Sequence, residues 1–343
     1  MVVKLAFLIF MALMSVAQAK PLLVDDGQIA VVKHNAKLVR SLKQKCNEEL
    51  LSPSHAVADF APQPHYSKQG PNPDDDQAKA LTSDIRAAYR GALCYRLTDQ
   101  TIYAQHAQML MDAWASTMKS ASNAQGSADI NFNIAQFVIA ASWVEHVNAW
   151  NAKPFMQWLR AVITPLSHAD QPNNHGNWGV LLDLSIAFFT QDQAAISKSY
   201  LRWGELILSQ VVEDGTMPLE MCRSNTSDHC GGPDKGINGL AYTHFALLPA
   251  ILAAELLHKQ ELEAYDTPAG QKMIAALRKS ALFTAMPSKF PYFTSNHGQL
   301  NKIDHCGYFA LALTHFSDEN ARAVLNAGKC KSDIWMLQKL YAQ

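Results

Sequence analysis

Apolar residues recur at spacings of three and four over most of this chain, which is the period of one face of an α-helix. The clearest segment follows Asp192, a residue type that caps helices, and stops before Gly215. Its apolar positions are Ile196, Tyr200, Trp203, Ile207 and Val211. Alternating β-branched residues beside Asn-Gly or Asp-Gly turns, the pattern typical of strands, are nearly absent. We therefore expect an all-α fold class.

Three further segments show the same helical period. Behind the acidic run Asp74–Asp76, which suits a helix start, the apolar positions are Leu81, Ile85 and Tyr89. Behind Asp99, which we expect to cap the next helix, they are Ile102, Met109, Leu110 and Ala113. In the third segment they are Ile134, Phe137, Val138, Ala141 and Val144. Helices of this length, joined by short polar links, predict antiparallel hairpins, and their number favours an α/α toroid over a four-helix bundle. A solenoid is the weaker alternative because the sequence shows no internal repeat.

One stretch interrupts the helical pattern. Between residues 51 and 77 the chain contains Gly70 and five prolines, which are Pro53, Pro62, Pro64, Pro71 and Pro73. Proline has no N–H to donate and cannot continue a helix, and a long irregular segment in a compact domain is usually functional. We predict that residues 51–77 form a lid loop over the functional face. Within it, Lys68 offers a cation to an anionic ligand, although an ordinary solvated lysine is the alternative.

The N-terminus has the features of an export signal over residues 1–19. Lys4 precedes an apolar run from Leu5 to Met14, and Ala17-Gln18-Ala19 is a small-residue cleavage site. The apolar run is too short to span a membrane. We expect the mature chain, residues 20–343, to be a single domain that is periplasmic or secreted, monomeric and not attached to a membrane.

Charge and composition narrow the possible partners. The chain has 29 Lys and Arg against 30 Asp and Glu, a formal net charge of −1. Removal of Lys4 with the signal leaves 28 against 30, a charge of −2. This balance does not suggest a nucleic-acid partner, so an anionic substrate would have to be bound by locally gathered cations. The 48% of hydrophobic residues can build a substantial core.

All six cysteines remain after signal removal, and an even number in an exported chain favours disulfides. The absence of a Cys-x-x-Cys pair argues against a zinc-thiolate site. Sequence does not determine connectivity. Pairing near neighbours gives the hypothesis Cys46–Cys94, Cys222–Cys230 and Cys306–Cys330.

The first group of polar residues with candidate chemistry is Gln171–Trp178, which precedes the apolar segment Val180–Phe189. Asn and Gly are poor helix formers, so these residues should lie on the turn that enters a helix, where free N–H groups attract anions. Asn174 and His175 could then hold a carboxylate. The simpler interpretation is that Asn173 or Asn174 caps the helix and Trp178 packs in the core.

The second group follows the segment after Asp192. The run Asp214–Arg223 leads through a Gly-rich loop to Tyr242, which begins another apolar helix. The Arg223 guanidinium can clamp a carboxylate with two hydrogen bonds. Cations near Tyr242 could lower the pKa of its phenol enough for proton transfer. The 13 histidines include no HxxxH or HExxH spacing, so we expect neither a catalytic metal nor another cofactor.

Together these motifs resemble one family. Asn-Asn-His-x-x-Trp at Asn173–Trp178, Asp-Gly-Thr-x-Pro-Leu-Glu-Met-x-Arg at Asp214–Arg223, a Tyr-x-x-Phe-Ala-Leu helix from Tyr242, and Ser67-Lys68 in an N-terminal loop are similar to the exported alginate lyase family. The resemblance implies an incomplete α/α toroid whose groove binds an acidic polysaccharide, which is cleaved by β-elimination without a required metal.

The resemblance also implies residue roles. Asn174 and Arg223 would neutralise the uronate carboxylate, which makes the C5 proton more acidic. His175 would assist or act as base, and Tyr242 would protonate the leaving oxygen. In mannuronate the C5 proton and O4 lie on the same side, so one tyrosine could serve as base and then as acid. In guluronate they are opposite, and a second group such as His175 must take the proton. We therefore expect a preference for mannuronate.

Four further residues are assigned to substrate binding. Lys68 and Tyr66 of the lid, together with Asn173 and Trp178, are expected to hold the sugars through charge, hydrogen bonding and stacking. The chain departs from the family pattern between Arg223 and Tyr242, where 18 residues intervene instead of about two helical turns. A Cys222–Cys230 disulfide could loop out the added segment, residues 224–236, and leave Arg223 in place.

Other functions remain open at this point. Glucuronan is an alternative substrate, because glucuronate has the same C4 and C5 arrangement as mannuronate. A toroid glycoside hydrolase would need two carboxylates, for which Glu213, Asp214 and Glu220 are candidates. However, Asp214 suits a turn, and Glu220 suits support of the Asn174–Arg223 pair. A non-catalytic binder of acidic glycans would not need both His175 and Tyr242.

Overall fold

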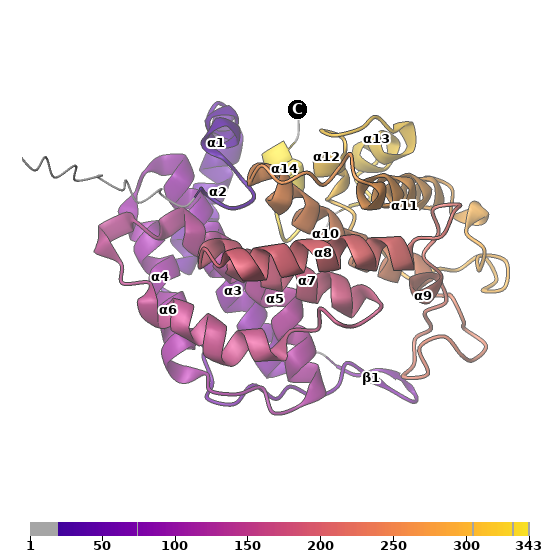
Figure 1. Ribbon diagram of the computed structural model, residues 1–343, viewed down its shortest axis with the longest axis horizontal. Helices are drawn as coiled ribbons and strands as arrows, with labels where there is room; N and C mark the ends of the chain where they lie inside the picture. The colour runs from indigo at the N-terminus through magenta and orange to yellow at the C-terminus, as the bar shows by residue number, and fades with distance from the viewer. Residues whose placement is uncertain (1–19, 74, 304, 331–332, 342–343) are drawn as a thin grey trace, which may run out of the picture.

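The computed structural model describes residues 20–73, 75–303, 305–330 and 333–341. The predicted export signal and Asp74 lie outside the described residues. Helices make up most of the described part (Figure 1). The α-helices are α1 (Asp26–Lys33), α2 (Ala36–Glu49), α3 (Asp76–Thr98), α4 (Thr101–Thr117), α5 (Ala124–Val144), α6 (Lys153–Trp158), α7 (Asn174–Phe189), α8 (Gln193–Gln210), α9 (Pro218–Met221), α10 (Gly239–Lys259), α11 (Pro268–Ala285), α12 (Phe309–Ala312), α13 (Glu319–Asn326) and α14 (Leu337–Tyr341). Short 3-10 or π turns occupy Val147–Ala149, Leu159–Ile163, Thr164–Leu166 and Pro287–Lys289, and one hairpin pairs β1 (Tyr66–Ser67) with β2 (Gly70–Pro71).

The helices form an inner and an outer layer. In the inner layer α3 packs on α5, α5 on α7, and α7 on α10. In the outer layer α4 covers α3 and α5, α8 covers α7, and α11 covers α10. Nearly all of α7 and most of α10 are buried, as expected for helices that are apolar on all sides. This arrangement is an incomplete α/α toroid, so the predicted fold class is confirmed.

The predicted helices are present with one correction. Asp192 caps α8 by accepting a hydrogen bond from the Ala195 N–H, and Asp75 caps α3 in the same way. Asp99, however, does not cap α4. It ends α3 in the left-handed conformation, with φ of 58°, and its carboxylate pairs with Lys33 at 3.1 Å. Gln100 follows Asp99 and is the N-cap residue of α4, so Asp99 lies one residue too early to cap that helix.

The long helix α10 passes through the centre of the fold. It is the one helix within the described residues that has the length and apolar composition of a membrane span, and 83% of its most apolar stretch is buried inside the protein. It packs on α7, α8, α9 and α11. Its apolar character therefore matches its place in the core.

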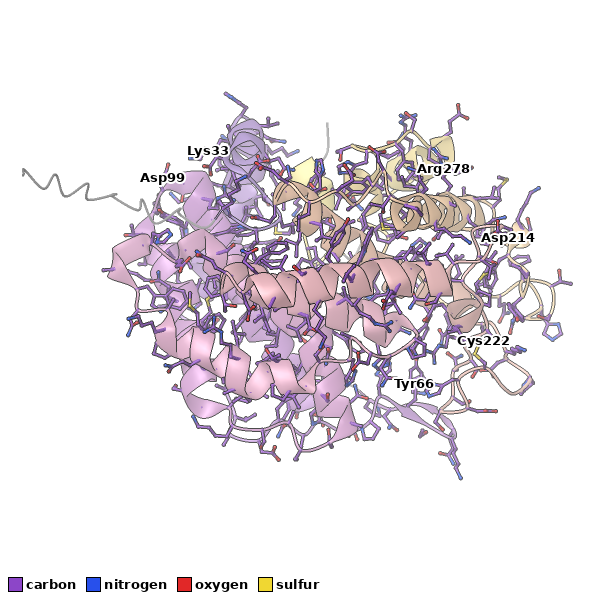
Figure 2. The ribbon with its side chains drawn as sticks, in the orientation of Figure 1. Lys33, Tyr66, Asp99, Asp214, Cys222 and Arg278 are labelled. Carbon is purple, nitrogen blue, oxygen red and sulfur yellow. A yellow bond between two sulfur atoms is a disulfide. The ribbon has the colours of Figure 1, made fainter. Side chains whose placement is uncertain are left out.

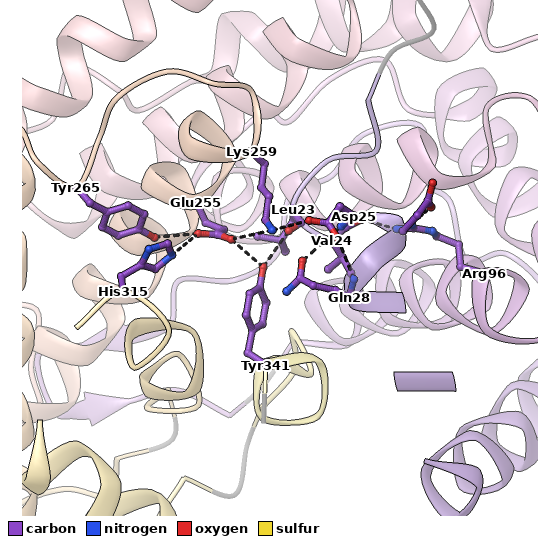
Figure 3. Close-up of polar contacts among 11 residues, drawn as sticks. Leu23, Val24, Asp25, Gln28, Arg96, Glu255, Lys259, Tyr265, His315 and Tyr341 are labelled. Atoms are coloured by element: carbon purple, nitrogen blue, oxygen red, sulfur yellow. Dashed lines mark hydrogen bonds and ion pairs between the residues drawn. The ribbon is translucent and has the colours of Figure 1, made fainter. Parts of the chain in front are cut away.

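The C-terminal end of α10 ties the two ends of the chain together (Figure 3). Glu255 accepts hydrogen bonds from Tyr265 at 3.0 Å and from Tyr341 at 3.3 Å. The Tyr341 hydroxyl also bonds the Leu23 carbonyl, and Lys259 pairs with Asp25 at 2.6 Å. This network fixes one end of α10, while the other end, about 20 Å away at 1.5 Å per residue, carries Tyr242.

Three disulfides connect all six cysteines. They are Cys46–Cys94, Cys222–Cys230 and Cys306–Cys330, with Cα separations of 6.7, 4.9 and 5.0 Å. These separations lie within the range that a disulfide requires. The hypothesis that near neighbours pair is confirmed.

Within its described residues, the predicted lid loop (51–77) is irregular apart from the β1–β2 hairpin, and its last two residues form the start of α3. Its first part is anchored on Asp84 of α3, whose carboxylate accepts a hydrogen bond of 2.7 Å from the His55 N–H. Its hairpin reaches the segment after Arg223, where the Ser227 N–H donates to the Ser67 carbonyl at 3.1 Å. The loop therefore lies over the face on which the motif residues gather. Its opening and closing remain a prediction.

Candidate active site

The first motif forms the start of α7. Asn173 is the N-cap, and its side chain accepts a hydrogen bond from the His175 N–H at 3.1 Å. A Cβ on Gly176 would lie 2.0 Å from the Gln171 carbonyl oxygen, so only glycine lets the preceding loop run this close to the helix. The turn therefore presents Asn174 and His175 together. Asn173 acts as a cap, as the simpler interpretation predicted.

Glu220 of α9 holds Asn174 in place. Its two carboxylate oxygens accept hydrogen bonds from the Asn174 N–H at 2.7 Å and from the Asn174 amide at 2.8 Å. The same carboxylate pairs with Arg223 at 3.6 Å. Burial raises the pKa of Glu220, while the Arg223 charge and the Asn174 hydrogen bonds act against that rise. Glu220 therefore links the two motifs, which confirms its predicted support of the Asn174–Arg223 pair.

Arg223 lies against Tyr242 despite the residues inserted between them. The Arg223 Cζ is 5.1 Å from the centre of the Tyr242 ring, a cation–π contact. Gly239 permits this approach, because a Cβ there would lie 1.9 Å from the Met221 carbonyl oxygen. The added segment, residues 224–236, loops out between the Cys222–Cys230 disulfide and the Asn238 N–H, which donates to the Arg223 carbonyl at 2.9 Å.

The pKa of Tyr242 is raised and not lowered, which corrects our prediction. Burial of the phenol is the main cause, and the charge of Tyr66 and a hydrogen bond with it add to the rise. Arg223 acts in the opposite direction but does not outweigh burial. Tyr242 is therefore a protonated phenol at neutral pH, suited to donate a proton.

The pKa of His175 is shifted in the opposite direction, so its imidazole is neutral at the same pH. Its pKa is lowered to about 4, mainly by burial and in addition by the charges of His168, Arg223 and His229. Its Nδ1 lies 3.1 Å from Nδ1 of His168. The site thus combines a neutral imidazole with a protonated phenol, both close to Arg223.

Trp178 does not have the predicted sugar-stacking role. It is 1% exposed and packs against Phe132 of α5 and Phe245 of α10, with ring centres 5.9 and 5.1 Å apart. A ring without an exposed face cannot stack on a sugar. The centre of the Phe132 ring also lies 5.2 Å from the centre of the His175 ring, so the imidazole packs against this aromatic cluster.

The lid supplies Tyr66 and Lys68. Tyr66 contributes to the raised pKa of Tyr242 and lies 3.5 Å from the Asn238 amide. Figure 2 shows Tyr66 at the same end of the molecule as Cys222, far from Lys33 and Asp99. Lys68 is exposed in the hairpin turn, and within the described residues it forms no hydrogen bond or ion pair. Its role in substrate binding remains a prediction.

The carboxylates that a hydrolase would need do not face one another. The Glu213 side chain is fully exposed and pairs with Lys272 at 3.4 Å. Asp214 accepts hydrogen bonds from Thr216 in the turn that Gly215 completes with φ of 82°, as predicted for this position. Glu220 is buried beneath Asn174. The three acids therefore do not flank a common glycosidic bond.

Comparison with known proteins identifies the family. The sequence model for alginate lyase matches residues 31–290, well over half of the chain. The chain belongs to the alginate lyase family. A comparison with curated protein sequences finds no match.

Solved alginate lyases share the fold of this family member. An alginate lyase from Bacteroides ovatus superposes with a TM-score of 0.72 at 17% identity, over 94% of this chain and 99% of the other. Alginate lyase A1-III from Sphingomonas species A1 gives 0.66 at 16% identity, over 88% of this chain and 91% of the other. A variant of A1-III complexed with a tetrasaccharide gives 0.64 at 18% identity, over 88% and 90%.

His168 is the main site residue that sequence analysis missed in this alginate lyase family member. It lies in the loop before α7, outside the Asn173–Trp178 motif, and no spacing rule connects it to His175. Asn131 holds it there, because the Asn131 side chain accepts a hydrogen bond from the His168 N–H at 2.9 Å. Within the described residues, no group of three His, Cys, Asp or Glu side chains is arranged to hold a metal ion.

Proposed function

We propose that this protein is an exported lyase that cleaves mannuronate-rich alginate by β-elimination. Its membership of the alginate lyase family supports a polysaccharide lyase. The observation that carries the proposal is the gathering of Asn174, His175, Arg223 and Tyr242 from three motifs close to one buried carboxylate, Glu220.

Arg223 and Asn174 bind and neutralise the uronate carboxylate in this proposal. The Arg223 guanidinium is held by Glu220 and by the Tyr242 ring, so it is oriented before substrate arrives. Asn174 is fixed through its backbone and its side chain. Donors that are positioned in advance stabilise the negative charge that develops on the carboxylate when the C5 proton leaves.

His175 and Tyr242 divide the proton transfers. His175 takes the C5 proton, the electrons of that bond form the C4–C5 double bond, and the bond from C4 to the glycosidic oxygen breaks. Tyr242 gives its phenolic proton to that oxygen. The neutral imidazole and the protonated phenol are the protonation states that these steps require. No water enters the products.

The position of Arg223 supports the preference for mannuronate. Both His175 and Tyr242 interact with this single guanidinium. In mannuronate the C5 proton and the leaving oxygen lie on the same side of the ring, where one tyrosine could serve both steps. The division between His175 and Tyr242 that we propose fits that side as well, because both groups lie beside one carboxylate clamp. In guluronate the base and the acid would have to face opposite sides of the ring.

The substrate assignment is tested by initial rates on purified poly-mannuronate, poly-guluronate and glucuronan. The ultraviolet absorbance of the new double bond reports elimination on all three polymers. We expect the fastest rate on poly-mannuronate. A faster rate on poly-guluronate would contradict the same-side arrangement, and a faster rate on glucuronan would move the assignment to that polymer, whose C4 and C5 arrangement is the same.

A further inference from the structure

A chain of hydrogen bonds leads from His175 through the half-buried loop before α7 to Ser127 of α5. His175 Nδ1 lies 3.1 Å from His168 Nδ1. The other nitrogen of His168, Nε2, lies 2.8 Å from the Ser127 hydroxyl of α5. That hydroxyl lies 3.1 Å from the Leu166 carbonyl oxygen. The proposed proton transfers use none of these three contacts directly.

The end of this chain fixes the position of every proton in it. A carbonyl oxygen can only accept, so the Ser127 hydroxyl donates its one proton to Leu166. The Ser127 oxygen must then accept a proton from His168 Nε2. A neutral His168 with its proton on Nε2 has a lone pair on Nδ1, which accepts from the Nδ1–H of His175. If the Ser127 hydroxyl instead donated its proton to His168 Nε2, no proton would be left for a hydrogen bond between Ser127 and the Leu166 carbonyl.

The chain is rigidly built on α5. Asn131, which is fully buried, donates to the Leu166 carbonyl at 2.8 Å and accepts from the His168 N–H. It also donates to the Ser127 carbonyl at 2.8 Å, one turn earlier on the same helix. Both the terminal acceptor and the backbone of His168 are therefore held by one side chain.

We propose that His168 is a positioning residue that holds His175 in the tautomer with a proton on Nδ1 and a free lone pair on Nε2. This inference rests on the proposed function, in which Nε2 of His175 takes the C5 proton. When it does, the imidazolium that forms keeps its Nδ1–H bond to His168, which stabilises the new charge. The arrangement resembles the way a fixed acceptor orients a catalytic imidazole in hydrolases, with a neutral histidine as the acceptor.

Both rings must be neutral before the reaction for this arrangement to hold. Burial lowers the pKa of His168 as well as that of His175. The charged or titratable groups that act on His175 are His168, Arg223 and His229, and all three disfavour a positive charge on it. Between them they keep the lone pair of Nε2 available at neutral pH.

The experiment is a long-range proton–nitrogen NMR spectrum of the protein labelled with ¹⁵N-histidine, recorded at neutral pH without substrate. The variants are Ser127→Ala, which removes the acceptor for His168 Nε2, and His168→Leu, which removes the acceptor for His175. His34→Gln, an exposed position at the end of α1, is the control for substitution itself. The same four proteins are then assayed for kcat and KM on poly-mannuronate.

We expect His175 in the unmodified protein to show a protonated Nδ1 and a bare Nε2. Both site variants should shift proton occupancy toward Nε2 and lower kcat about 10- to 100-fold with KM little changed, because only the orientation of the base is lost. His34→Gln should match the unmodified protein in both measurements. Ser127→Ala keeps both imidazoles, so it serves even if His168→Leu fails to fold.

A proton on Nε2 of His175 in the unmodified protein would overturn the inference, even if alginate is cleaved. An unchanged His175 spectrum in Ser127→Ala would overturn it too. A bare Nε2 that becomes protonated in the variants supports the role of His168 whichever polymer is cleaved. Failure of the inference and failure of the proposed function are thus read from different signals.

Discussion

Asp84 anchors the first part of the lid loop, and its replacement gives a quantitative test of how that loop is held. One carboxylate oxygen accepts from the His55 N–H at 2.7 Å, from the Trp114 indole at 2.8 Å and from the Ser54 hydroxyl at 3.2 Å. The other oxygen lies 2.7 Å from His55 Nδ1. The carboxylate thus joins residues 54 and 55 to α3 and α4.

The structure predicts different losses in the free energy of unfolding for two substitutions of Asp84. In Asp84→Ala the indole of Trp114, which is fully buried, cannot reach water, and an unsatisfied buried donor costs about 1–3 kcal/mol. The His55 and Ser54 donors are less buried and find water, so their loss adds about 1 kcal/mol. We expect the free energy of unfolding to fall by about 2–4 kcal/mol. In Asp84→Asn the amide oxygen keeps three donors and the amide N–H faces the Nδ1 atom of His55, so the fall should stay below about 1 kcal/mol.

Urea denaturation followed by tryptophan fluorescence measures both losses, and KM for poly-mannuronate measures the effect on the lid. We expect KM to rise in Asp84→Ala because the loop that carries Tyr66 and Lys68 is less well anchored. The matched control is Asp99→Asn, which tolerates the left-handed backbone at this position. Its loss of the exposed ion pair with Lys33 should cost less than about 1 kcal/mol. Equal stability of the Ala and Asn variants at Asp84 would refute this reasoning.

Three further outcomes follow from the site. Tyr242→Phe should lower kcat about 10²- to 10⁴-fold while polymer binding persists, because only the phenolic proton is lost; a near-normal rate would remove Tyr242 as the acid. Lys68→Ala should raise KM, and the difference from the unmodified protein should shrink at high salt, where the lost charge is already screened; an unchanged KM at low salt would exclude Lys68 from the site. The pKa of His175 is lowered from 6.5 to about 4, so its neutral form contributes stability above pH 6.5 that is lost as the pH falls toward 4, and kcat should fall over the acidic end of this range. A His175→Gln variant that kept the same slope of unfolding free energy against pH would contradict this assignment.

Features that depend on local sequence were predicted correctly, apart from the cap assigned to Asp99. The spacing of apolar residues identified the helices that became α3, α4, α5 and α8, because one buried face must recur every three or four positions. The disulfides followed from pairing near neighbours. The motif residues Asn174, Arg223 and Tyr242 came together around Glu220, as the motif resemblance implied.

Features that depend on burial and three-dimensional packing were not predicted correctly from the sequence. The number of cations near Tyr242 suggested a lowered pKa, but the extent of its burial, which sequence does not give, decides the opposite direction. Trp178 follows polar residues in the chain, yet two rings from α5 and α10 enclose it. His168 reaches His175 because a loop folds back on the start of α7, and no periodicity reports such a contact.

The central claim is elimination, and the most direct test is to measure ultraviolet absorbance and new reducing ends together during digestion of poly-mannuronate with chelator present. If Asn174, His175, Arg223 and Tyr242 act as proposed, each new reducing end is accompanied by one C4–C5 double bond, and the two signals rise in equal amounts. New reducing ends without absorbance would mean that water cleaves the bond, and this result would contradict the account.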